Sequence, residues 1–149
     1  MTDPHAFDAG RAVAEVDALL TAPVPPEGFA TLQLWEGPSL VGVYEEEWAA
    51  AEATAQGRLA AVRGALDARW GPHRNVGMRV PIFRKIDGAS MPPLFRSLVD
   101  QDLNGDLAVW GPVGDKGRYV GVSLNQCDGD APMIVAAVVS QDPIVELED

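Results

Sequence analysis

The sequence predicts an α+β fold in which an antiparallel sheet packs against a long central helix. The first observation is a run of residues, about 45–70, whose apolar side chains recur at three- and four-residue steps. The second is a series of three apolar, β-branched runs in the C-terminal part of the chain, at 106–110, 118–126 and 133–141. Because only short loops with Gly and Pro separate these runs, they are expected to form an antiparallel meander. At 149 residues, the chain is expected to be a single domain, 1–149.

The N-terminal residues 4–20 are predicted to form a helix. Asp3 can cap its first turn and Pro4 suits the first helical position, while the apolar side chains fall roughly on one side. A proline-rich connector ends this helix. Two short apolar and β-branched runs then flank a Gly-Pro pair, at 31–35 and 40–44, and this arrangement indicates a β-hairpin.

The run at 45–70 has the end signals of a helix as well as its periodicity. Six apolar residues recur along one side of it: Trp48, Ala55, Leu59, Val62, Leu66 and Trp70. Three glutamates, Glu45 to Glu47, open the run and Arg69 lies near its end, so both complement the helix dipole. Gly71 and Pro72 then stop the helix.

Residues 75–86 alternate in the side of the chain to which they point, and are predicted to form a strand. Pro81 has no N–H to give to a sheet, so this strand is expected at an edge or at a bulge. A short helix is predicted at about 92–104, because two prolines can begin it and apolar side chains then recur at helical spacing. Among the C-terminal strands, 133–141 is apolar at nearly every position and is expected to be the most buried.

The charge balance argues against several classes of partner. With 22 acidic and 11 basic residues the net charge is −11, so phosphate backbones and anionic membranes repel the protein. We therefore expect neither nucleic-acid binding nor membrane binding. The single cysteine, Cys127, excludes an internal disulfide and suits a reducing compartment. The N-terminus lacks the features of a signal peptide and no apolar run is long enough to span a bilayer, so a cytoplasmic protein is expected.

One stretch, VDQDLNGDL at 99–107, is similar to the start of an EF-hand calcium loop. Three oxygen-bearing side chains occupy alternate positions: Asp100, Asp102 and Asn104. However, Gly111 stands where the loop needs its bidentate glutamate, and a strand is predicted where the exit helix should follow. Leu103 also continues the apolar stripe of the preceding helix. We interpret the stretch as the end of that helix, with Asn104 or Gly105 in the left-handed conformation, and predict no metal site.

The other candidates for chemistry are weak. A thiol nucleophile could pair Cys127 with His73, but Asp128 and Asp130 follow the cysteine, and their charges would raise the pKa of the thiol. Two histidines and one cysteine cannot build a structural zinc site. The sequence contains no Walker A, nucleophile-elbow or dinucleotide-binding motif, and no cofactor is expected.

A basic segment at 68–86 stands out in this acidic chain, because it contains five bases and no acid. Four of its residues form the candidate patch for an anion or an acidic partner: Arg74, Arg79, Phe83 and Lys85. If 75–86 is a strand, the last three of them share one face. The alternative is that these bases neutralise acids of the same chain, such as Glu45 to Glu47 or Asp100 and Asp102.

Two functions from different classes remain open. The absence of catalytic motifs and the small acidic domain favour a non-enzymatic protein-interaction module, in the manner of proteins that neutralise a basic partner. The alternative is a small-molecule or anion-binding protein or an enzyme, with a site where the sheet meets the long helix. That site would use Arg74, Arg79, Tyr119 or Asn125. A deep pocket would favour the second function, and a flat apolar patch would favour the first.

Overall fold

The computed structural model describes residues 5–149. This part of the chain forms an α+β fold of four helices and a five-stranded antiparallel sheet, which confirms the predicted fold class. The helices are α1 (Ala9–Thr21), α2 (Glu45–Trp70), α3 (Arg79–Asp87) and α4 (Pro93–Asp100). The strands are β1 (Phe29–Glu36), β2 (Arg74–Val76), β3 (Leu107–Val113), β4 (Arg118–Asn125) and β5 (Ile134–Ser140), and their order in the sheet is β1-β5-β4-β3-β2.

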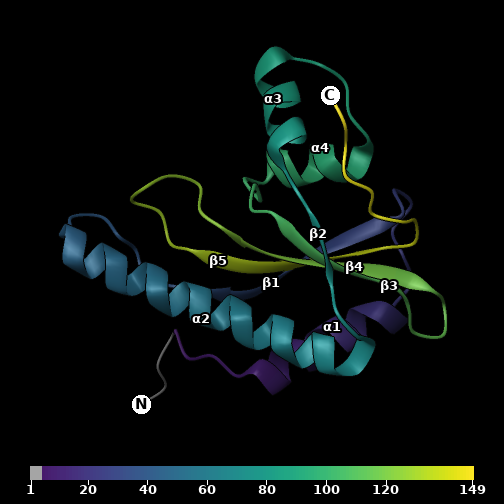
Figure 1. Ribbon diagram of the computed structural model, residues 1–149, viewed down its shortest axis with the longest axis horizontal. Helices are drawn as coiled ribbons and strands as arrows, with labels where there is room; N and C mark the ends of the chain where they lie inside the picture. Colours follow the sequence, from purple (N-terminus) through teal and green to yellow (C-terminus); the bar gives the residue numbers. More distant parts are fainter. Residues whose placement is uncertain (1–4) are drawn as a thin grey trace.

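The sheet lies between two layers of helices, with α1 and α2 on one face and α3 and α4 on the other (Figure 1). Successive side chains of a strand point to opposite faces, so β5 contributes to both cores. Val135, Ala137 and Val139 pack towards α1 and α2, whereas Val138 packs towards α4. Six of the seven residues of β5 are buried, as expected for a strand that is apolar at nearly every position.

Helix α2 is longer than the sheet that it covers. Its 26 residues span about 39 Å, whereas the seven or eight residues of the longer strands span roughly 25 Å. The first turns of α2 and the β4–β5 loop therefore project together at one end of the molecule (left in Figure 1). The Trp48 indole N–H donates to the carbonyl oxygen of Gly129 at 2.9 Å. The main-chain N–H of Leu40 donates to the carbonyl oxygen of Asp130 at 3.0 Å.

The N-terminal helix begins later than the sequence predicted. The carboxylate of Asp8 accepts hydrogen bonds from the main-chain N–H groups of Gly10 (2.9 Å) and Arg11 (3.3 Å), so Asp8 is the N-cap and α1 starts at Ala9. The predicted cap, Asp3 and Pro4, lies outside the described residues.

The predicted hairpin at 31–44 is wrong. The first run is β1, but its partner is β5, about a hundred residues further along the chain. The second run is not a strand: it contains a turn with Gly42 at a φ of 74° and then leads directly into α2. The main-chain N–H of Leu40 donates to Asp130 in the β4–β5 loop. Residues 40–44 are therefore held against that loop and do not pair with β1.

The predicted strand at 75–86 is also wrong over most of its length. Only β2 is extended, and it pairs with β3; residues 79–87 form α3. The physical reason lies in Pro81, the third residue of this helix. The first N–H groups of a helix have no partner within it, so a proline in the first turn removes no hydrogen bond. At Met78, the residue just before the helix, the main-chain N–H donates to the Asp106 carboxylate at 2.8 Å.

Helix α4 confirms the predicted short helix but ends at Asp100. The N–H of Leu103 donates to the carbonyl oxygen of Leu98 at 2.8 Å and the N–H of Asp102 to that of Val99 at 3.2 Å, which is a Schellman motif. Asp102, with a φ of 60°, takes the left-handed position, not Asn104 or Gly105. Leu103 then packs against the core between the sheet and α4, which favours this early ending.

Candidate functional site

The basic residues singled out in the sequence are divided between two elements. Arg74 lies exposed in β2, whereas Arg79, Phe83 and Lys85 lie in α3. Arg79 and Phe83 are one turn apart, and the guanidinium carbon lies 5.2 Å from the centre of the ring. Lys85 points elsewhere, because six residues of a helix correspond to a rotation of about 240°. The expectation that Arg79, Phe83 and Lys85 share a face is therefore wrong for Lys85.

Two of these bases, Arg79 and Lys85, lie close to acids of the same chain. The Lys85 ammonium donates to the carbonyl oxygen of Val99 at 2.8 Å and lies 3.5 Å from the Asp100 carboxylate. Arg79 lies 3.6 Å from the carboxylate of Asp149, in the C-terminal segment. The Lys85–Asp100 pair is about half exposed and the Arg79–Asp149 pair is largely exposed, so each contributes little to stability. Binding of an anion or an acidic partner by Arg74, Arg79, Phe83 and Lys85 stays a prediction.

Asp100 and Asp102, two of the three residues of the calcium-like stretch, face different partners. The Asp100 carboxylate faces Lys85, whereas the Asp102 carboxylate accepts a hydrogen bond from the Cys127 thiol at 3.3 Å. Gly105 has a different role from the one predicted: a Cβ there would lie 2.0 Å from the carbonyl oxygen of Leu124. Within residues 5–149, no three acidic, histidine or cysteine side chains are grouped so as to hold a metal ion.

Cys127 and His73 lie at opposite ends of α2. The loop that contains Cys127 contacts Trp48 near the start of this helix, whereas His73 follows its end. The hydrogen bond to Asp102, together with the charge of that carboxylate, raises the pKa of the Cys127 thiol, and the charge of Asp128 adds to this effect. The predicted direction was therefore correct, although the main cause is Asp102, which only the fold brings close.

A polar cluster that the sequence did not reveal joins the end of α2 to β3. The Asp67 carboxylate accepts hydrogen bonds from the main-chain N–H of His73 (2.9 Å) and from the indole N–H of Trp110 (3.0 Å). The Nδ1 atom of His73 also lies 3.0 Å from this carboxylate. Desolvation raises the pKa of Asp67, but the hydrogen bonds from His73 and Trp110 outweigh it, so the net shift is downward. No periodic pattern links these three positions, because their proximity depends on the pairing of β2 with β3.

Tyr119 and Asn125 lie on the face of the sheet opposite α2. Tyr119 packs against the core beneath α3 and α4. Asn125 is buried, and its side-chain amide donates to the carbonyl oxygen of Ile134 at 3.2 Å and accepts from the N–H of Gly105 at 2.9 Å. Neither residue is therefore near the junction of the sheet and the long helix, where the sequence placed a small-molecule site.

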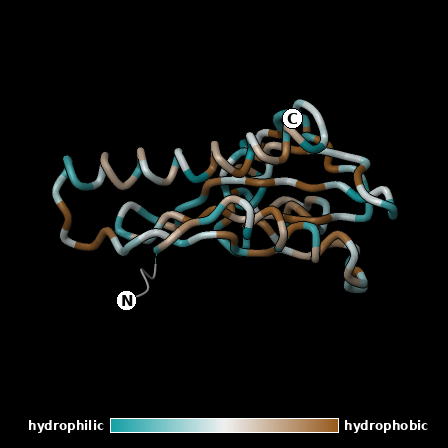
Figure 2. The backbone as a smooth tube through the Cα atoms, turned by 90° about the horizontal axis from the view of Figure 1, so that it is seen from below, coloured by the Kyte–Doolittle hydropathy of each residue, from teal (hydrophilic) through white to brown (hydrophobic). Residues whose placement is uncertain are grey.

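The projecting end of α2 carries the most distinctive surface, which we call the acidic tip. It is made of two exposed apolar residues and five acidic ones: Val41, Tyr44, Glu45, Glu46, Glu47, Asp128 and Asp130. Tyr44 is 80% exposed and Val41 is 72% exposed. At the same end, Figure 2 shows an apolar stretch of chain that leads into α2. The sequence has no Lys or Arg between residues 39 and 57, and none after Arg118.

Tyr44 occupies the N-cap position of α2 and makes no capping hydrogen bond through its side chain. Ser, Thr, Asp or Asn at this position would satisfy an N–H group of the first turn. Helices α3 and α4 also lack a side-chain cap, so what distinguishes Tyr44 is its exposure. A large aromatic side chain that neither caps the helix nor packs into the core is therefore a candidate contact residue.

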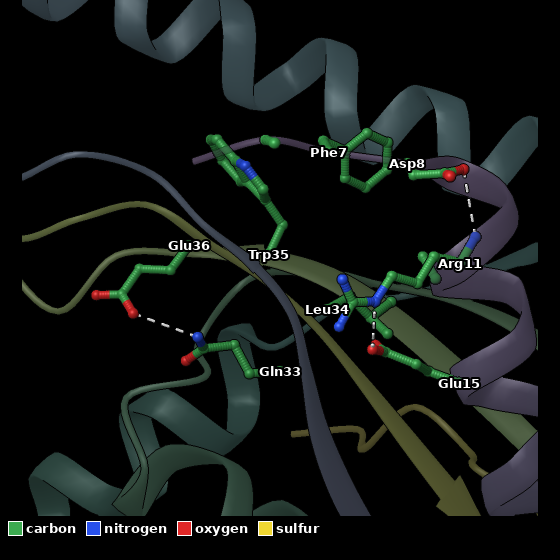
Figure 3. Close-up of a pocket in the computed structure, with 10 residues that line it drawn as sticks. Phe7, Asp8, Arg11, Glu15, Gln33, Leu34, Trp35 and Glu36 are labelled. Carbon is green, nitrogen blue, oxygen red and sulfur yellow. Dashed lines mark hydrogen bonds and ion pairs between the residues drawn. The ribbon is translucent and has the colours of Figure 1, made fainter. Parts of the chain in front are cut away.

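Open hollows flank other parts of the surface. The larger has a volume of about 380 Å³ and lies between the start of α1 and β1 (Figure 3). Its charged and polar side chains bind one another: Arg11 lies 3.5 Å from Glu15, and Gln33 donates to Glu36 at 3.2 Å. A second hollow, of about 300 Å³, lies between α4 and the C-terminal segment.

No family model, curated protein or solved structure matches the chain. No helix of residues 5–149 is both long and apolar enough to cross a membrane.

Proposed function

We propose that the protein is a non-enzymatic interaction module that binds a basic protein partner through the acidic tip. The observation that carries this proposal is the exposure of Tyr44 and Val41 within a group of five carboxylates. Exposed aromatic side chains are frequent anchors of protein interfaces. Carboxylates around such an anchor attract a basic surface and discourage an acidic one.

The charge distribution supports a basic partner. The glutamates of the tip stabilise the start of α2, which is the structural role expected from the sequence. Asp128 and Asp130 lie in the β4–β5 loop beside the helix, where the Asp128 carboxylate accepts hydrogen bonds from the main-chain N–H groups of Asp130 (2.9 Å) and Ala131 (3.0 Å). Carboxylates from two separate segments therefore extend one acidic surface around Tyr44. Such a surface accelerates association with a basic protein, and the acceleration falls as salt is added.

The experiment is affinity purification of the tagged chain from its source organism, followed by measurement of the affinity of the purified partner. The variant Tyr44→Ser removes the exposed ring, and Phe83→Ser is the matched control, because Phe83 is also exposed (50%) but lies on α3. We expect Tyr44→Ser to lower affinity by about thirtyfold, in the range of an interface anchor, and Phe83→Ser to leave it unchanged.

Two results with these variants would contradict the proposal. One is a partner that binds Tyr44→Ser as tightly as the natural sequence. The other is loss of binding with Phe83→Ser alone, which would move the interface to the basic residues of α3. A partner whose association rate is independent of salt would also count against a basic surface.

A second candidate function is the binding of a small molecule, and the hollow of about 300 Å³ beside α4 favours it. Its volume is at the lower end of the range for ligand pockets, and apolar residues such as Phe29, Leu94 and Ile144 line it. It lies against α4, not at the junction of the sheet with α2. A thermal-shift screen of metabolites would test this candidate, with Leu94→Glu as the variant that should abolish any stabilisation.

A further inference from the structure

β1 forms one edge of the sheet, and among the described residues only β5 pairs with it. The opposite edge is β2, which has three residues. An edge strand presents unpaired N–H and C=O groups on which another strand can build. With eight residues, β1 is long enough to act as such a template.

The register of β1 against β5 determines which main-chain groups face outward. The N–H of Gln141 donates to the carbonyl oxygen of Gly28 at 2.9 Å, so this is a hydrogen-bonded pair. Bonded and non-bonded pairs alternate along an antiparallel ladder. Leu32 therefore bonds to β5, whereas the N–H and C=O groups of Thr31 and Gln33 point away from the sheet.

The ladder shifts between Gln33 and Trp35, and this irregularity limits the open stretch. Beyond it, the outward carbonyl oxygen of Glu36 lies 3.2 Å from the ring nitrogen Nδ1 of His5. The main-chain groups offered to another strand are thus those before the irregularity, around Thr31 and Gln33.

Hollows lie on both sides of this stretch. The hollow of about 380 Å³ lies beside α1, and a second one of about 170 Å³ lies on the face of the sheet covered by α4. Gln33 lines both. Figure 3 shows Gln33 and Glu36 on one side of β1, with Phe7 and Arg11 on the other. An added strand would direct alternate side chains to the two faces, one set towards each hollow.

The two hollows differ in charge. The hollow of about 380 Å³ is lined by three acids and one base, of which Asp8, Glu15 and Arg11 lie on the α1 side of β1 and Glu36 lies on its other side. Phe7 and Trp35 contribute aromatic rings to this hollow. The guanidinium carbon of Arg58 lies 5.4 Å from the centre of the Phe7 ring and 5.9 Å from the centre of the Trp35 ring. The hollow on the α4 face is lined by neutral residues only.

We propose that β1 accepts an extended segment of a basic protein as a sixth strand. The segment places a lysine or arginine side chain in the hollow beside α1 and a small neutral side chain in the hollow beside α4. Pairing of β1 with a second copy of the chain is disfavoured, since each copy carries a net charge of −11. The edge strand β1 is separate from the acidic tip. The proposal for β1 rests on the proposed function only in taking the partner to be a basic protein.

The test is a displayed library of random peptides of about ten residues, long enough to pair with β1, selected on the full chain. We expect selected peptides to carry a basic side chain with a small neutral residue directly on each side of it, because neighbouring residues of a strand point to opposite faces. In hydrogen exchange followed by NMR, the bound peptide should slow exchange of the Thr31 and Gln33 amides at least tenfold, and leave Leu32 unchanged because β5 already protects it.

Two variants separate main-chain pairing from side-chain contact. Gln33→Pro removes an outward N–H that the sheet does not use, and should lower peptide affinity at least tenfold. Gln33→Ala removes the same side chain but keeps that N–H, so it should lower peptide affinity clearly less than Gln33→Pro does. If Gln33→Pro does not fold, the exchange measurement on the natural sequence still decides the question.

Other results would overturn the proposal. One such result is a library that gives no peptide with a Kd below about 100 µM. Another is a bound peptide that slows amide exchange at residues other than Thr31 and Gln33. A third is a set of selected peptides that lack a basic side chain. A dimer in sedimentation that Gln33→Pro disrupts would assign the edge to self-association instead. The peptides are selected without the natural partner, so a failed selection would not contradict the proposal that the acidic tip binds a basic protein. Conversely, a Tyr44→Ser variant that binds the natural partner as tightly as before would not contradict the proposal for β1.

Discussion

The guanidinium of Arg118, in β4, donates to the main-chain carbonyl oxygen of Ala22, the C-cap residue that follows α1, at 2.6 Å. The same nitrogen lies 2.9 Å from the carbonyl oxygen of Leu20. The last turn of α1 has no basic residue of its own, so β4 supplies the positive charge that complements its carbonyl groups. Arg118 is 6% exposed, which makes these hydrogen bonds part of the core.

Replacing this arginine should destabilise the fold. We expect Arg118→Met to lower the free energy of unfolding by about 2–4 kcal/mol, because hydrogen bonds from a charged donor are lost and buried carbonyl groups are left unpaired. Lys116→Met is the matched control: its ammonium is exposed and only 3.4 Å from the carbonyl oxygen of Thr21, so its effect should stay below about 0.5 kcal/mol. Urea unfolding of both variants measures the difference, and equal effects would contradict a special role for Arg118.

The lowered pKa of Asp67 predicts a dependence of stability on pH. A carboxylate whose folded pKa lies below its unfolded value stabilises the fold above the unfolded pKa, and this contribution is lost as the pH falls through the folded pKa. The window therefore lies at and below the ordinary aspartate value of 3.8. Asp67→Asn should reduce the loss of stability between neutral pH and about pH 3. Asp115→Asn, exposed on the β3–β4 turn, is the control and should not change that loss.

Two glycines should respond in opposite directions to alanine. A Cβ at Gly105 would lie 2.0 Å from the main-chain oxygen of Leu124, so β4 would have to move. We expect Gly105→Ala to cost about 3 kcal/mol or more, or to prevent folding. Gly57 lies in α2 with open space at its Cβ, and Gly57→Ala should stabilise the protein by roughly 0.5–1 kcal/mol. Thermal unfolding measures both effects: Gly105→Ala should lower the melting temperature and Gly57→Ala should raise it.

Tyr44 should show a trade-off between stability and binding. Tyr44→Ser supplies a capping oxygen at the start of α2, so the free protein should gain about 1 kcal/mol in urea unfolding. The same variant should bind the basic partner more weakly, because the exposed ring is lost. Tyr44→Phe is the control for both effects: it adds no cap and keeps the ring. A serine variant that is less stable than the natural sequence would indicate that Tyr44 is held by the fold and is not free for a partner.

Much of the fold could be predicted from the sequence, because its strongest signals are local. The apolar period of α2 and the continuous apolar run of β5 are each contained in one segment, and both elements were predicted within about a residue of their observed bounds. The short helix before Asp102 was also predicted. Its end was not, since the sequence favoured glycine or asparagine in the left-handed position, whereas the bonds to Leu98 and Val99 placed Asp102 there.

The candidate sites depended on tertiary structure to a greater degree. The glutamates of the tip were recognised from the sequence as helix-stabilising residues, but the exposure of Tyr44 and the contact of Gly129 with Trp48 depend on where the β4–β5 loop packs. The bonds among Asp67, His73 and Trp110 similarly depend on the pairing of β2 with β3.

The sequence by itself determined the helix α2, the strand character of the C-terminal runs and the α+β class. It did so because a helix satisfies its hydrogen bonds within a few residues, and a strand shows its burial in its own composition. Only the tertiary structure decided that β1 pairs with β5, and that Pro81 sits in the first turn of α3. Strand pairing joins residues about a hundred positions apart, and a proline fits both an edge strand and a helix start, so local pattern cannot choose between them.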